Sequence, residues 1–233
     1  QMLQRISLAV HKNYPEIYQM ALLVDERPEE ATDFKRNLPI AVHASTTDKG
    51  PREHIRTAER VFVEALERLY AGEDVLILMD SITRLARAYN TVHGSSSRTL
   101  SGGVTAGALE RPRQLFGVAR NFEDEGSVTI IATALIDTGS RMDEVIFEEF
   151  KGTGNSEIVL DRKVSDKRIF PALDVGKSGT RKEELLVDQA TLSKMYVLRR
   201  ILMQMGTVDA MEFLLDKMKD SKTNEDFFET MNQ

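Results

Sequence analysis

The chain contains 233 residues, of which 41% are hydrophobic and 29% are charged, and this balance excludes an intrinsically disordered protein. Its 31 basic and 37 acidic residues give a formal net charge of −6, which excludes a bulk positive field that would attract nucleic acid or anionic membranes. The absence of cysteine excludes disulfides, thiolate nucleophiles and Cys-ligated metal centres. The length allows one large domain or two small ones.

The N-terminal segment has no basic region followed by an apolar one, and no run approaches the roughly 18 to 20 apolar residues of a membrane-spanning helix. We therefore expect a cytoplasmic protein without a membrane partner. Helical apolar spacing begins at once, over 2–10, and the first residue is Gln1 rather than Met. We interpret the sequence as a fragment that begins inside a domain.

Three short apolar runs occupy 20–24, 75–79 and 128–136. Such runs are typical of strands that are buried on both faces, and the segments 58–71 and 81–89 between them have helical periodicity. Alternation of strands and helices predicts an α/β fold with a mainly parallel sheet.

Each of these runs ends in a carboxylate, namely Glu26, Asp80 or Asp137. Ligands of parallel sheets bind beyond the carboxyl ends of the strands, so we expect the three carboxylates to share one crevice. Asp80 is suited to holding hydrated Mg²⁺ through its oxygens, and the alternative is a cap on the following helix. Glu26 is a candidate general base, whereas Pro28 and the acidic residues after it are typical of a helix N-terminus.

Two segments rich in glycine lack an apolar period. The first, 92–107, is expected to be a mobile loop, and the second, 151–155, separates a helix-like run at 142–150 from a strand-like run at 157–160. From Lys182 onward the composition is helical, with breaks at Gly206 and near Ser221 and a cap at 223–226.

Basic residues gather in two places. Arg84 and Arg87 lie three residues apart, hence on one helix face, where they can reach phosphate or a partner's carboxylates; the alternative is a solvated face. The second cluster surrounds 176–180 and consists of Arg168, Lys177, Arg181 and Lys182. Its segment 176–178 reads Gly-Lys-Ser, but Pro171 stands where the phosphate-loop signature needs its first glycine, so a surface turn is predicted. The four histidines are scattered, and zincin and serine-hydrolase motifs are absent.

Four motifs, read in order, carry a resemblance to a known family: DERPEE at 25–30, DSITRLARAYN at 80–90, FKGTGN at 150–155 and SGTRKEELL at 178–186. Together they closely resemble the ATPase domain of the Rho family of bacterial transcription termination factors. The match runs from near residue 1 to residue 233. A D-S-[ILV]-T-R run also occurs in rotary and flagellar secretion ATPases, whereas the four motifs in this order are specific.

The resemblance implies a RecA-like P-loop NTPase core with a mainly parallel sheet and C-terminal helices. On this basis 1–233 is a partial RecA-like domain, with the sheet core and pore loops in 1–175 and the arginine-finger segment and helical part in 176–233. It also implies a homo-hexameric ring that binds ATP and Mg²⁺ between subunits, threads RNA through its central pore and acts on the RNA polymerase elongation complex. The family's phosphate loop is absent from the chain and is expected directly upstream of Gln1.

The resemblance also implies roles for individual residues. Asp80 matches the acid that helps to hold Mg²⁺, Glu26 the carboxylate that activates the attacking water, Arg181 the arginine finger and Arg168 a second interface arginine. An interface role is also expected for Arg84 and Arg87. The first RNA-binding pore loop matches Leu100, Ser101, Gly102, Gly103 and Val104. The second matches Lys151, Gly152, Thr153 and Gly154.

Two departures from the family qualify this interpretation. Thr105 and Gly107 stand where more polar residues are expected after the first pore loop, and without a phosphate loop the isolated chain should bind ATP poorly. One alternative is a flagellar or rotary-type secretion ATPase, which is not expected to carry both 151–154 and 181–184. Another is a non-catalytic RNA-clamp ring module, for which the triplet Glu26, Asp80 and Arg181 would have no use.

Overall fold

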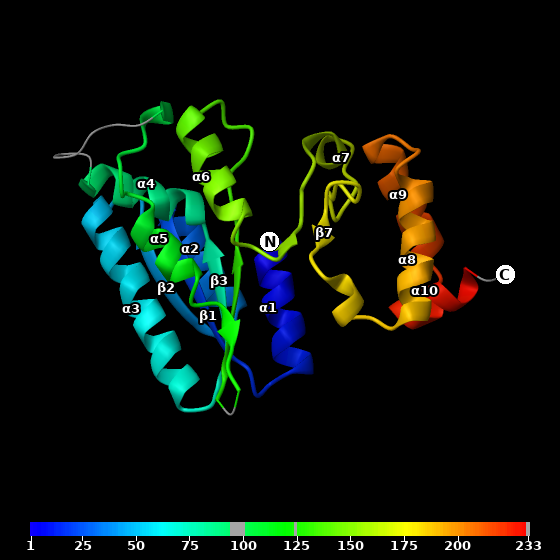
Figure 1. Cartoon of the computed structure of the whole chain (residues 1–233), viewed down its shortest axis with the longest axis horizontal. Coiled ribbons are helices and arrows are strands. Elements are labelled where there is room, and N and C mark those ends of the chain that lie inside the picture. Colours follow the sequence, from blue (N-terminus) through cyan, green and yellow to red (C-terminus); the bar gives the residue numbers. More distant parts are fainter. Residues whose placement is uncertain (94–100, 124, 232–233) are drawn as a thin grey trace. The chain divides into compact units, whose positions relative to one another are not determined.

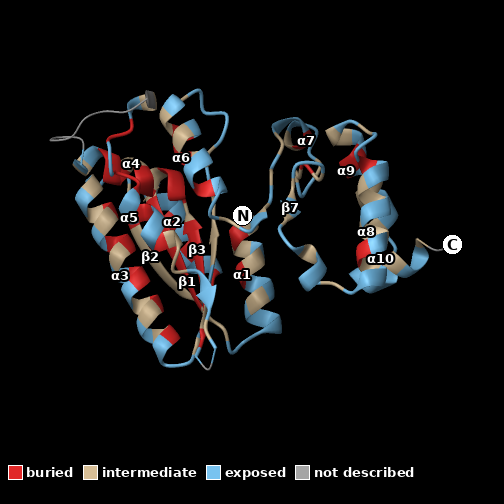
Figure 2. Cartoon of the chain, in the orientation of Figure 1, coloured by how far each residue is buried: buried red, intermediate tan, exposed pale blue. Residues whose placement is uncertain are grey.

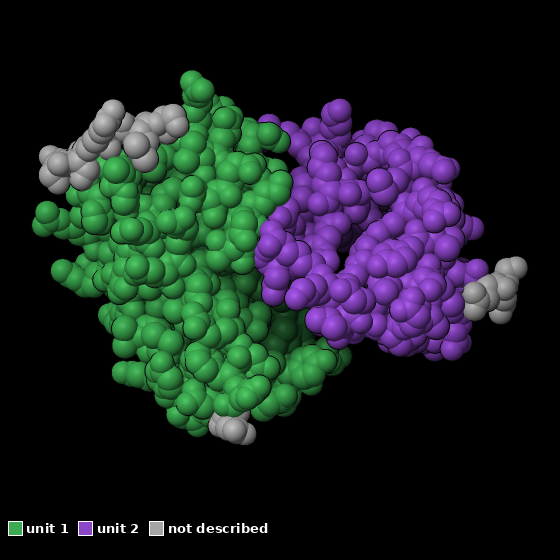
Figure 3. All heavy atoms as spheres, in the orientation of Figure 1, with its two compact units in different colours: residues 1–153 green, residues 154–233 purple. Residues whose placement is uncertain are grey.

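The computed structural model describes residues 1–93, 101–123 and 125–231. These residues form two compact units, unit 1 (residues 1–153) and unit 2 (residues 154–233), and each is described by itself (Figure 3). The division expected at 175/176 falls inside unit 2, shortly before its second strand. Within the described part of the chain, no helix has the length and apolar character needed to cross a bilayer.

Unit 1 is built on a five-stranded sheet with the order β2-β1-β3-β5-β4 (Figure 1). Its strands are β1 (Tyr18–Glu26), β2 (Ala41–Thr46), β3 (Asp74–Asp80), β4 (Arg120–Asn121) and β5 (Ser127–Ala132). The four longer strands are parallel, and only the short edge strand β4 is antiparallel. The mainly parallel sheet is thus confirmed, and β1, β3 and β5 arise from the three apolar runs.

The helices of unit 1 include those predicted from 2–10, 58–71, 81–89 and 142–150. The helices are α1 (Met2–Asn13), α2 (Pro28–Asn37), α3 (Pro51–Tyr70), α4 (Ile82–His93), α5 (Glu110–Phe116) and α6 (Arg141–Lys151), with one 3₁₀ turn, η1 (Ser101–Gly103). However, α3 begins seven residues earlier than predicted, at Pro51 rather than at 58, and α5 was not predicted. Pro28 occupies the first turn of α2, as predicted, because its missing N–H would have no intrahelical partner there.

The central strands β1 and β3 are buried on both faces, and their alternate side chains enter different cores (Figure 2). On β1, Met20 and Leu22 join the cluster formed with α3, α4, α5 and α6. Ala21 and Leu23 join the cluster formed with α1 and α2. The sheet is therefore the middle of three layers, and this arrangement brings the loops that follow the parallel strands to one edge.

Unit 2 contains a two-stranded antiparallel sheet and short helices. Its elements are β6 (Ser156–Glu157), α7 (Arg162–Asp166), β7 (Gly179–Thr180), the 3₁₀ turn η2 (Glu183–Leu185), α8 (Gln189–Leu202), α9 (Thr207–Met218) and α10 (Asn224–Thr230). The predicted breaks are confirmed: Gly206 precedes α9, and Thr223 caps α10 by accepting a hydrogen bond from Asp226 N at 3.1 Å. Gly176 and Lys177 are exposed in a turn, as predicted, whereas Ser178 is half-buried and its Oγ donates to Asp174 O at 2.7 Å.

Three expected boundaries are wrong. The strand predicted at 157–160 ends at Glu157, and Leu160 makes only a single bridge to Leu173. The helix predicted from Lys182 begins at Gln189, after η2. The strand predicted over 128–136 ends at Ala132, because the chain then leaves the sheet towards α4, where Leu135 N donates to Thr83 Oγ1 at 2.9 Å.

Candidate functional site

Glu26 and Asp80 lie at the carboxyl ends of adjacent parallel strands. Glu26 ends β1 and Asp80 ends β3, and the register pairs Asp80 with Leu23. Glu26 is 6% exposed. Burial, followed by the nearby charge of Asp80, raises the pKa of Glu26 from 4.5 to about 7, against the opposing effect of Arg84. The two carboxylates therefore share one site, as predicted from the sequence.

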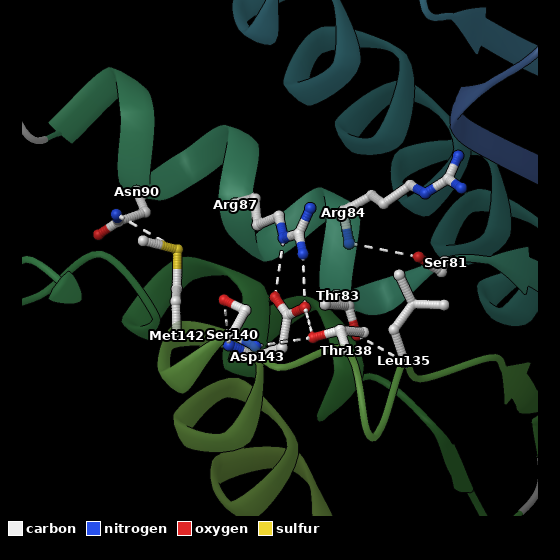
Figure 4. Close-up of polar contacts among 10 residues, drawn as sticks. All are labelled: Ser81, Thr83, Arg84, Arg87, Asn90, Leu135, Thr138, Ser140, Met142 and Asp143. Carbon is white, nitrogen blue, oxygen red and sulfur yellow. Dashed lines mark hydrogen bonds and ion pairs between the residues drawn. The ribbon is translucent and has the colours of Figure 1, made fainter. Parts of the chain in front are cut away.

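Arg84 supplies the positive charge of this site from the first turn of α4. Its Nη1 lies 2.7 Å from Glu26 Oε1 and also donates a hydrogen bond to the carbonyl oxygen of Asp25. Its backbone N donates to Ser81 Oγ at 3.3 Å, so Ser81, and not Asp80, caps α4 (Figure 4). The helix start thus aims a guanidinium at the buried acid.

Asp80 is anchored on the neighbouring strand rather than on its own helix. Its Oδ1 accepts a hydrogen bond from Thr133 Oγ1 at 2.6 Å. Thr133 N donates to Met79 O at 2.9 Å, and Ile82 N donates to Thr133 O at 3.0 Å. These bonds fix the direction of the carboxylate at the edge of the sheet.

The third expected carboxylate is not a strand-end residue. Asp137 lies five residues beyond the end of β5, in the loop before α6, and is exposed. We expected Asp137 in the crevice because 128–136 was predicted as one strand. That expectation is wrong, because β5 ends at Ala132.

Arg87 lies one turn further along α4 and binds the start of α6. Its Nε donates to Asp143 Oδ1 at 2.8 Å and its Nη2 donates to Asp143 Oδ2 at 2.5 Å (Figure 4). Thr138 Oγ1 donates to the same carboxylate at 2.6 Å. Asp143 is 1% exposed, and the hydrogen bond from Arg87 holds its pKa below the ordinary value. Arg84 and Arg87 thus contact carboxylates of their own chain, and their expected interface role stays a prediction.

The described part of the first glycine-rich segment is tied to α4. Asn90 Nδ2 donates to Gly103 O at 3.1 Å, and Thr105 N donates to Asn90 Oδ1 at 2.7 Å. Val104 is 4% exposed and belongs to the core, so its side chain points inward. Leu100 lies outside the described residues.

Gly102 fits closely against α6, the helix that begins after the loop at 137–140. With φ at +77°, a Cβ on Gly102 would lie 2.9 Å from Val145 Cγ2 and 3.1 Å from Arg141 O. The neighbour of the first glycine-rich segment is therefore the first half of α6. Arg141 is exposed there, and the sequence reasoning did not single it out. The signal that was available is a basic residue directly after the helix cap Ser140.

The second predicted pore loop lies at the other end of α6. Lys151 is the last residue of the helix, Gly152 follows as its cap, and Thr153 N donates to Phe150 O at 2.9 Å. A rise of 1.5 Å per residue separates the two ends of α6 by about 15 Å. Gly154 is the first residue of unit 2.

The two predicted interface arginines are exposed residues of unit 2. Arg181 directly follows β7, and its backbone N donates to Asn155 O at 2.8 Å. Arg168 follows α7 with φ at 61°. Two residues after Arg181, Glu183 accepts a hydrogen bond at 2.5 Å from Nη2 of Arg199 to its Oε2. Whether these arginines act on the site of a neighbouring subunit stays a prediction.

The donor set of unit 1 fits part of a Mg²⁺–nucleotide site. Asp80 offers the hard carboxylate oxygens that Mg²⁺ prefers, at the edge where ligands of parallel sheets bind, and Glu26 lies beside it on the adjacent strand. No cluster of three or more acidic, His or Cys side chains capable of binding a metal occurs in 1–93, 101–123 and 125–231. An ion bound at this edge would be within the reach of Asp80, directly or through water.

Comparison with known proteins agrees with this geometry. Residues 18–180 match the model of the ATP synthase alpha/beta family, nucleotide-binding domain. The chain belongs to this family. As a member of the ATP synthase alpha/beta family it has the RecA-like nucleotide-binding fold expected from the sequence.

Curated relatives of this chain include Rho termination factors, which confirms the resemblance. "Transcription termination factor Rho" of Cereibacter sphaeroides is 60% identical over 231 residues, covering 99% of this chain and 55% of the relative. The proteins of the same name from Salmonella typhimurium and Escherichia coli K12 are 56% identical over 232 residues, covering 100% of this chain and 55% of each relative. The chain spans about half the length of these relatives.

Solved structures of ATPases share the fold. A prototypical ATPase from the type III secretion system of pathogenic bacteria is 25% identical with a TM-score of 0.74, over 91% of this chain and 62% of that one. The assembled ATPase of the type III secretion system of enteropathogenic E. coli is 23% identical with a TM-score of 0.70, over 92% and 59%. The second likeness concerns the fold alone.

Proposed function

We propose that this chain is the ATP-hydrolysing domain of an RNA-dependent helicase that ends transcription. The observation that carries the proposal is the buried carboxylate of Glu26, with a pKa of about 7, beside Asp80 and Arg84 at the carboxyl edge of the sheet. Relatives that are 56–60% identical bear the name of a transcription termination factor. Their name supports the biological role, and the geometry supports the chemistry.

In this proposal Glu26 accepts a proton from the water that attacks the γ-phosphate. A base is most effective when its pKa lies near the working pH, and burial beside Asp80 brings Glu26 to that range. Arg84 limits the rise of the pKa and fixes the direction of the carboxylate. Mg²⁺, when bound with ATP, supplies charge neutralisation for the phosphates, and Asp80 is the residue that would hold it through water.

Arg181 and Arg168 act in trans in a homo-hexameric ring. A guanidinium suits this task because it stays charged and binds phosphate oxygens through two parallel hydrogen bonds. The backbone N of Arg181 donates to Asn155 O, and this hydrogen bond fixes the backbone from which the exposed side chain extends.

RNA occupies the centre of this ring. With a net charge of −6 the contacts must be local, and the described candidates are 101–103 and 151–154. The packing of Gly102 against the first half of α6 adds Arg141 to this proposed surface. A partnership with the RNA polymerase elongation complex and a cytoplasmic location follow from the same role.

A secretion ATPase is the second candidate, favoured by the 25% identical ATPase of a type III secretion system. The sequence identities decide against it, since 60% over 99% of the chain outweighs 25% over 91%. A non-catalytic RNA clamp is the third candidate. Against it stands a buried acid whose pKa is raised to about 7, which a passive ring does not need.

The test is ATP hydrolysis by the full-length protein that carries this chain, with poly-pyrimidine RNA, with the equivalent DNA and without nucleic acid. We expect stimulation by RNA only. Glu26→Gln should bind ATP but lose about 10²- to 10⁴-fold in turnover. Glu29→Gln is the matched control, because Glu29 is an exposed acid of the adjoining helix turn.

Arg181→Ala should assemble normally and lose turnover, with the exposed Arg162→Ala as its control. Hydrolysis that ignores RNA would favour the secretion ATPases, and no hydrolysis under any condition would favour the clamp. Normal turnover by Glu26→Gln would overturn the assignment of the base.

A further inference from the structure

A buried histidine lies behind the proposed site and takes no part in the chemistry assigned so far. His54 is in the first turns of α3 and is 5% exposed. Its Nδ1 is 2.8 Å from Ser45 Oγ, and its Nε2 is 3.7 Å from Asp25 Oδ1. Ser45, near the end of β2, is 2% exposed. A buried imidazole thus stands between a hydroxyl of β2 and a carboxylate of β1.

Asp25 is the residue directly before Glu26, and its backbone is unusual. The β1–β2 register shifts between Val24 and Glu26, so Asp25 is an extra residue in β1. Its φ of 55° is in the left-handed region, which non-glycine residues rarely occupy unless their surroundings hold them there. This bulge sets the direction in which the next side chain, Glu26, leaves the strand.

Two side chains approach this bulge from different elements. Arg84 of α4 donates to the Asp25 carbonyl oxygen and pairs with Glu26. His54 of α3 faces the Asp25 carboxylate. The hydrogen bond with Asp143 is the main cause that raises the pKa of Arg87, and the Asp25 charge adds to it, so Arg87 is a further charged group that faces the Asp25 carboxylate.

The Ser45 hydroxyl can donate to or accept from His54 Nδ1, and the Asp25 carboxylate opposite Nε2 favours the tautomer with its proton on Nε2. If the Ser45 hydroxyl donates to Nδ1, the neutral ring carries its proton on Nε2, directed at the carboxylate. The other tautomer would direct a lone pair at the negative charge. The arrangement Ser45–His54–Asp25 therefore favours one orientation of the ring and one position of the Asp25 side chain.

We propose that His54 is a positioning residue for the reaction: together with Ser45 it holds Asp25 in the bulged conformation that aims the Glu26 carboxylate. This rests on the proposed function, because it requires Glu26 to act as the base. A displacement of a catalytic group by about 1 Å can cost 10²-fold in rate. A contact that keeps the Glu26 carboxylate in position therefore affects turnover.

The competing interpretation is that His54 only fills space and satisfies Ser45. The chain offers a matched control for it. His43 is two residues before Ser45 on β2, and its Nε2 lies 3.7 Å from Glu64 Oε2 of the same helix α3. Glu64 is ten residues beyond His54, about 15 Å along the helix, so His43 makes a similar contact away from the site.

Two substitutions separate positioning from space filling. His54→Asn keeps a polar atom near Ser45 but does not extend to Asp25. His54→Gln extends further and can direct an amide N–H at Asp25. The measurements are kcat and KM for ATP and the pH dependence of kcat in the full-length protein, with thermal unfolding of each variant as the check on folding.

We expect His54→Asn to lower kcat about 10- to 100-fold with KM changed less than about twofold, as for other residues that orient catalytic groups. The acid limb of its pH profile should move to higher pH, because the Arg84 contact that lowers the pKa of Glu26 loosens with the bulge. His54→Gln should recover most of the activity, and His43→Asn should be close to wild type. Ser45→Ala, a smaller change, should show the same pattern with a loss of about 3- to 10-fold.

Wild-type kcat in His54→Asn, equal losses in the Asn and Gln variants, or an equal loss in His43→Asn would overturn the proposal. If His54→Asn does not fold, Ser45→Ala decides: wild-type kcat with an unmoved acid limb rejects the proposal. Glu26→Gln separates the two levels of inference. Normal turnover of Glu26→Gln rejects the proposed function, whereas an inactive Glu26→Gln with an active His54→Asn rejects only the positioning role.

Discussion

One nitrogen of Arg84 serves two consecutive residues of β1. Nη1 lies 2.7 Å from Glu26 Oε1 and donates a hydrogen bond to the Asp25 carbonyl oxygen. Arg84 therefore fixes the backbone and the side chain of the proposed base together. It is also the cation that opposes the effects of burial and of Asp80 on the pKa of Glu26.

Replacing Arg84 by Gln should raise the pKa of Glu26 above about 7, because the neighbouring cation that favours the carboxylate is lost. The acid limb of the kcat profile should shift to higher pH, with several-fold lower turnover at pH 7 and partial recovery at pH 9. Steady-state ATPase assays across pH measure this. Arg36→Gln, at an exposed position near the end of α2, is the control, and an unshifted limb in Arg84→Gln would contradict the prediction.

Glu26→Gln should stabilise the folded protein at alkaline pH. The folded-state pKa of about 7 exceeds the ordinary 4.5, so folding opposes ionisation, and the stability present below pH 4.5 is lost as the pH rises through 7. Gln mimics the protonated acid, so the variant should gain about 2 kcal/mol at pH 8 and nothing at pH 4.5, after allowance for solvent near the site. Thermal unfolding at the two pH values measures the difference, and equal stability at pH 8 would reject the prediction.

Arg87→Ala should destabilise the protein by about 2 to 3 kcal/mol, because it leaves the buried Asp143 carboxylate without its cation. The pKa of Asp143 is lowered in the folded state, so the effect holds at neutral pH and fades in acid below the ordinary value of 3.8. Arg113→Ala is the control. Arg113 of α5 pairs at 2.9 Å with Glu149 of α6, the helix that also carries Asp143, but both side chains are exposed. We therefore expect Arg113→Ala to lower the free energy of unfolding by less than about 0.5 kcal/mol.

Gly102→Ala should disturb the glycine-rich segment more than Gly107→Ala does. Both residues have positive φ, which costs alanine about 1 kcal/mol. At Gly102 the new Cβ would also lie 2.9 Å from Val145 Cγ2, whereas nothing lies within 4 Å at Gly107. We expect Gly102→Ala to cost about 1 kcal/mol more in unfolding and to weaken RNA-stimulated hydrolysis. Equal effects of the two substitutions would argue against the packing of this segment on α6.

The parallel sheet and its two acids could be predicted because their signals are local. The residues of 20–24 and 75–79 are apolar without interruption, and each run is followed by a carboxylate. The strand β2 was missed because AVHAST contains a histidine and two hydroxyl side chains. In the structure, Ser45 and His43 of that strand contact His54 and Glu64 of α3. Polar partners on another element cannot be read from a local sequence pattern.

The parts of the site that depend on tertiary contacts could not be predicted. Spacing placed Arg84 and Arg87 on one helix face, but it could not show that each meets an acid of its own chain. Composition marked 92–107 as a loop, and the structure shows that its second half is held by Asn90. Residues without regular periodicity can still be fixed by a single side-chain amide.

The extra residue in β1 also makes this strand sensitive to its own length. The extra residue of a bulge bends the strand locally, and its removal restores a regular ladder. Deletion of Asp25 would leave Glu26 paired with Thr46 of β2, but it would remove the carbonyl oxygen to which Arg84 donates and the carboxylate that faces His54. A related sequence that has the same glutamate but is one residue shorter here would align with Glu26 and still lack the geometry of this site. At this position the spacing of the chain is as much a part of the site as the side chains.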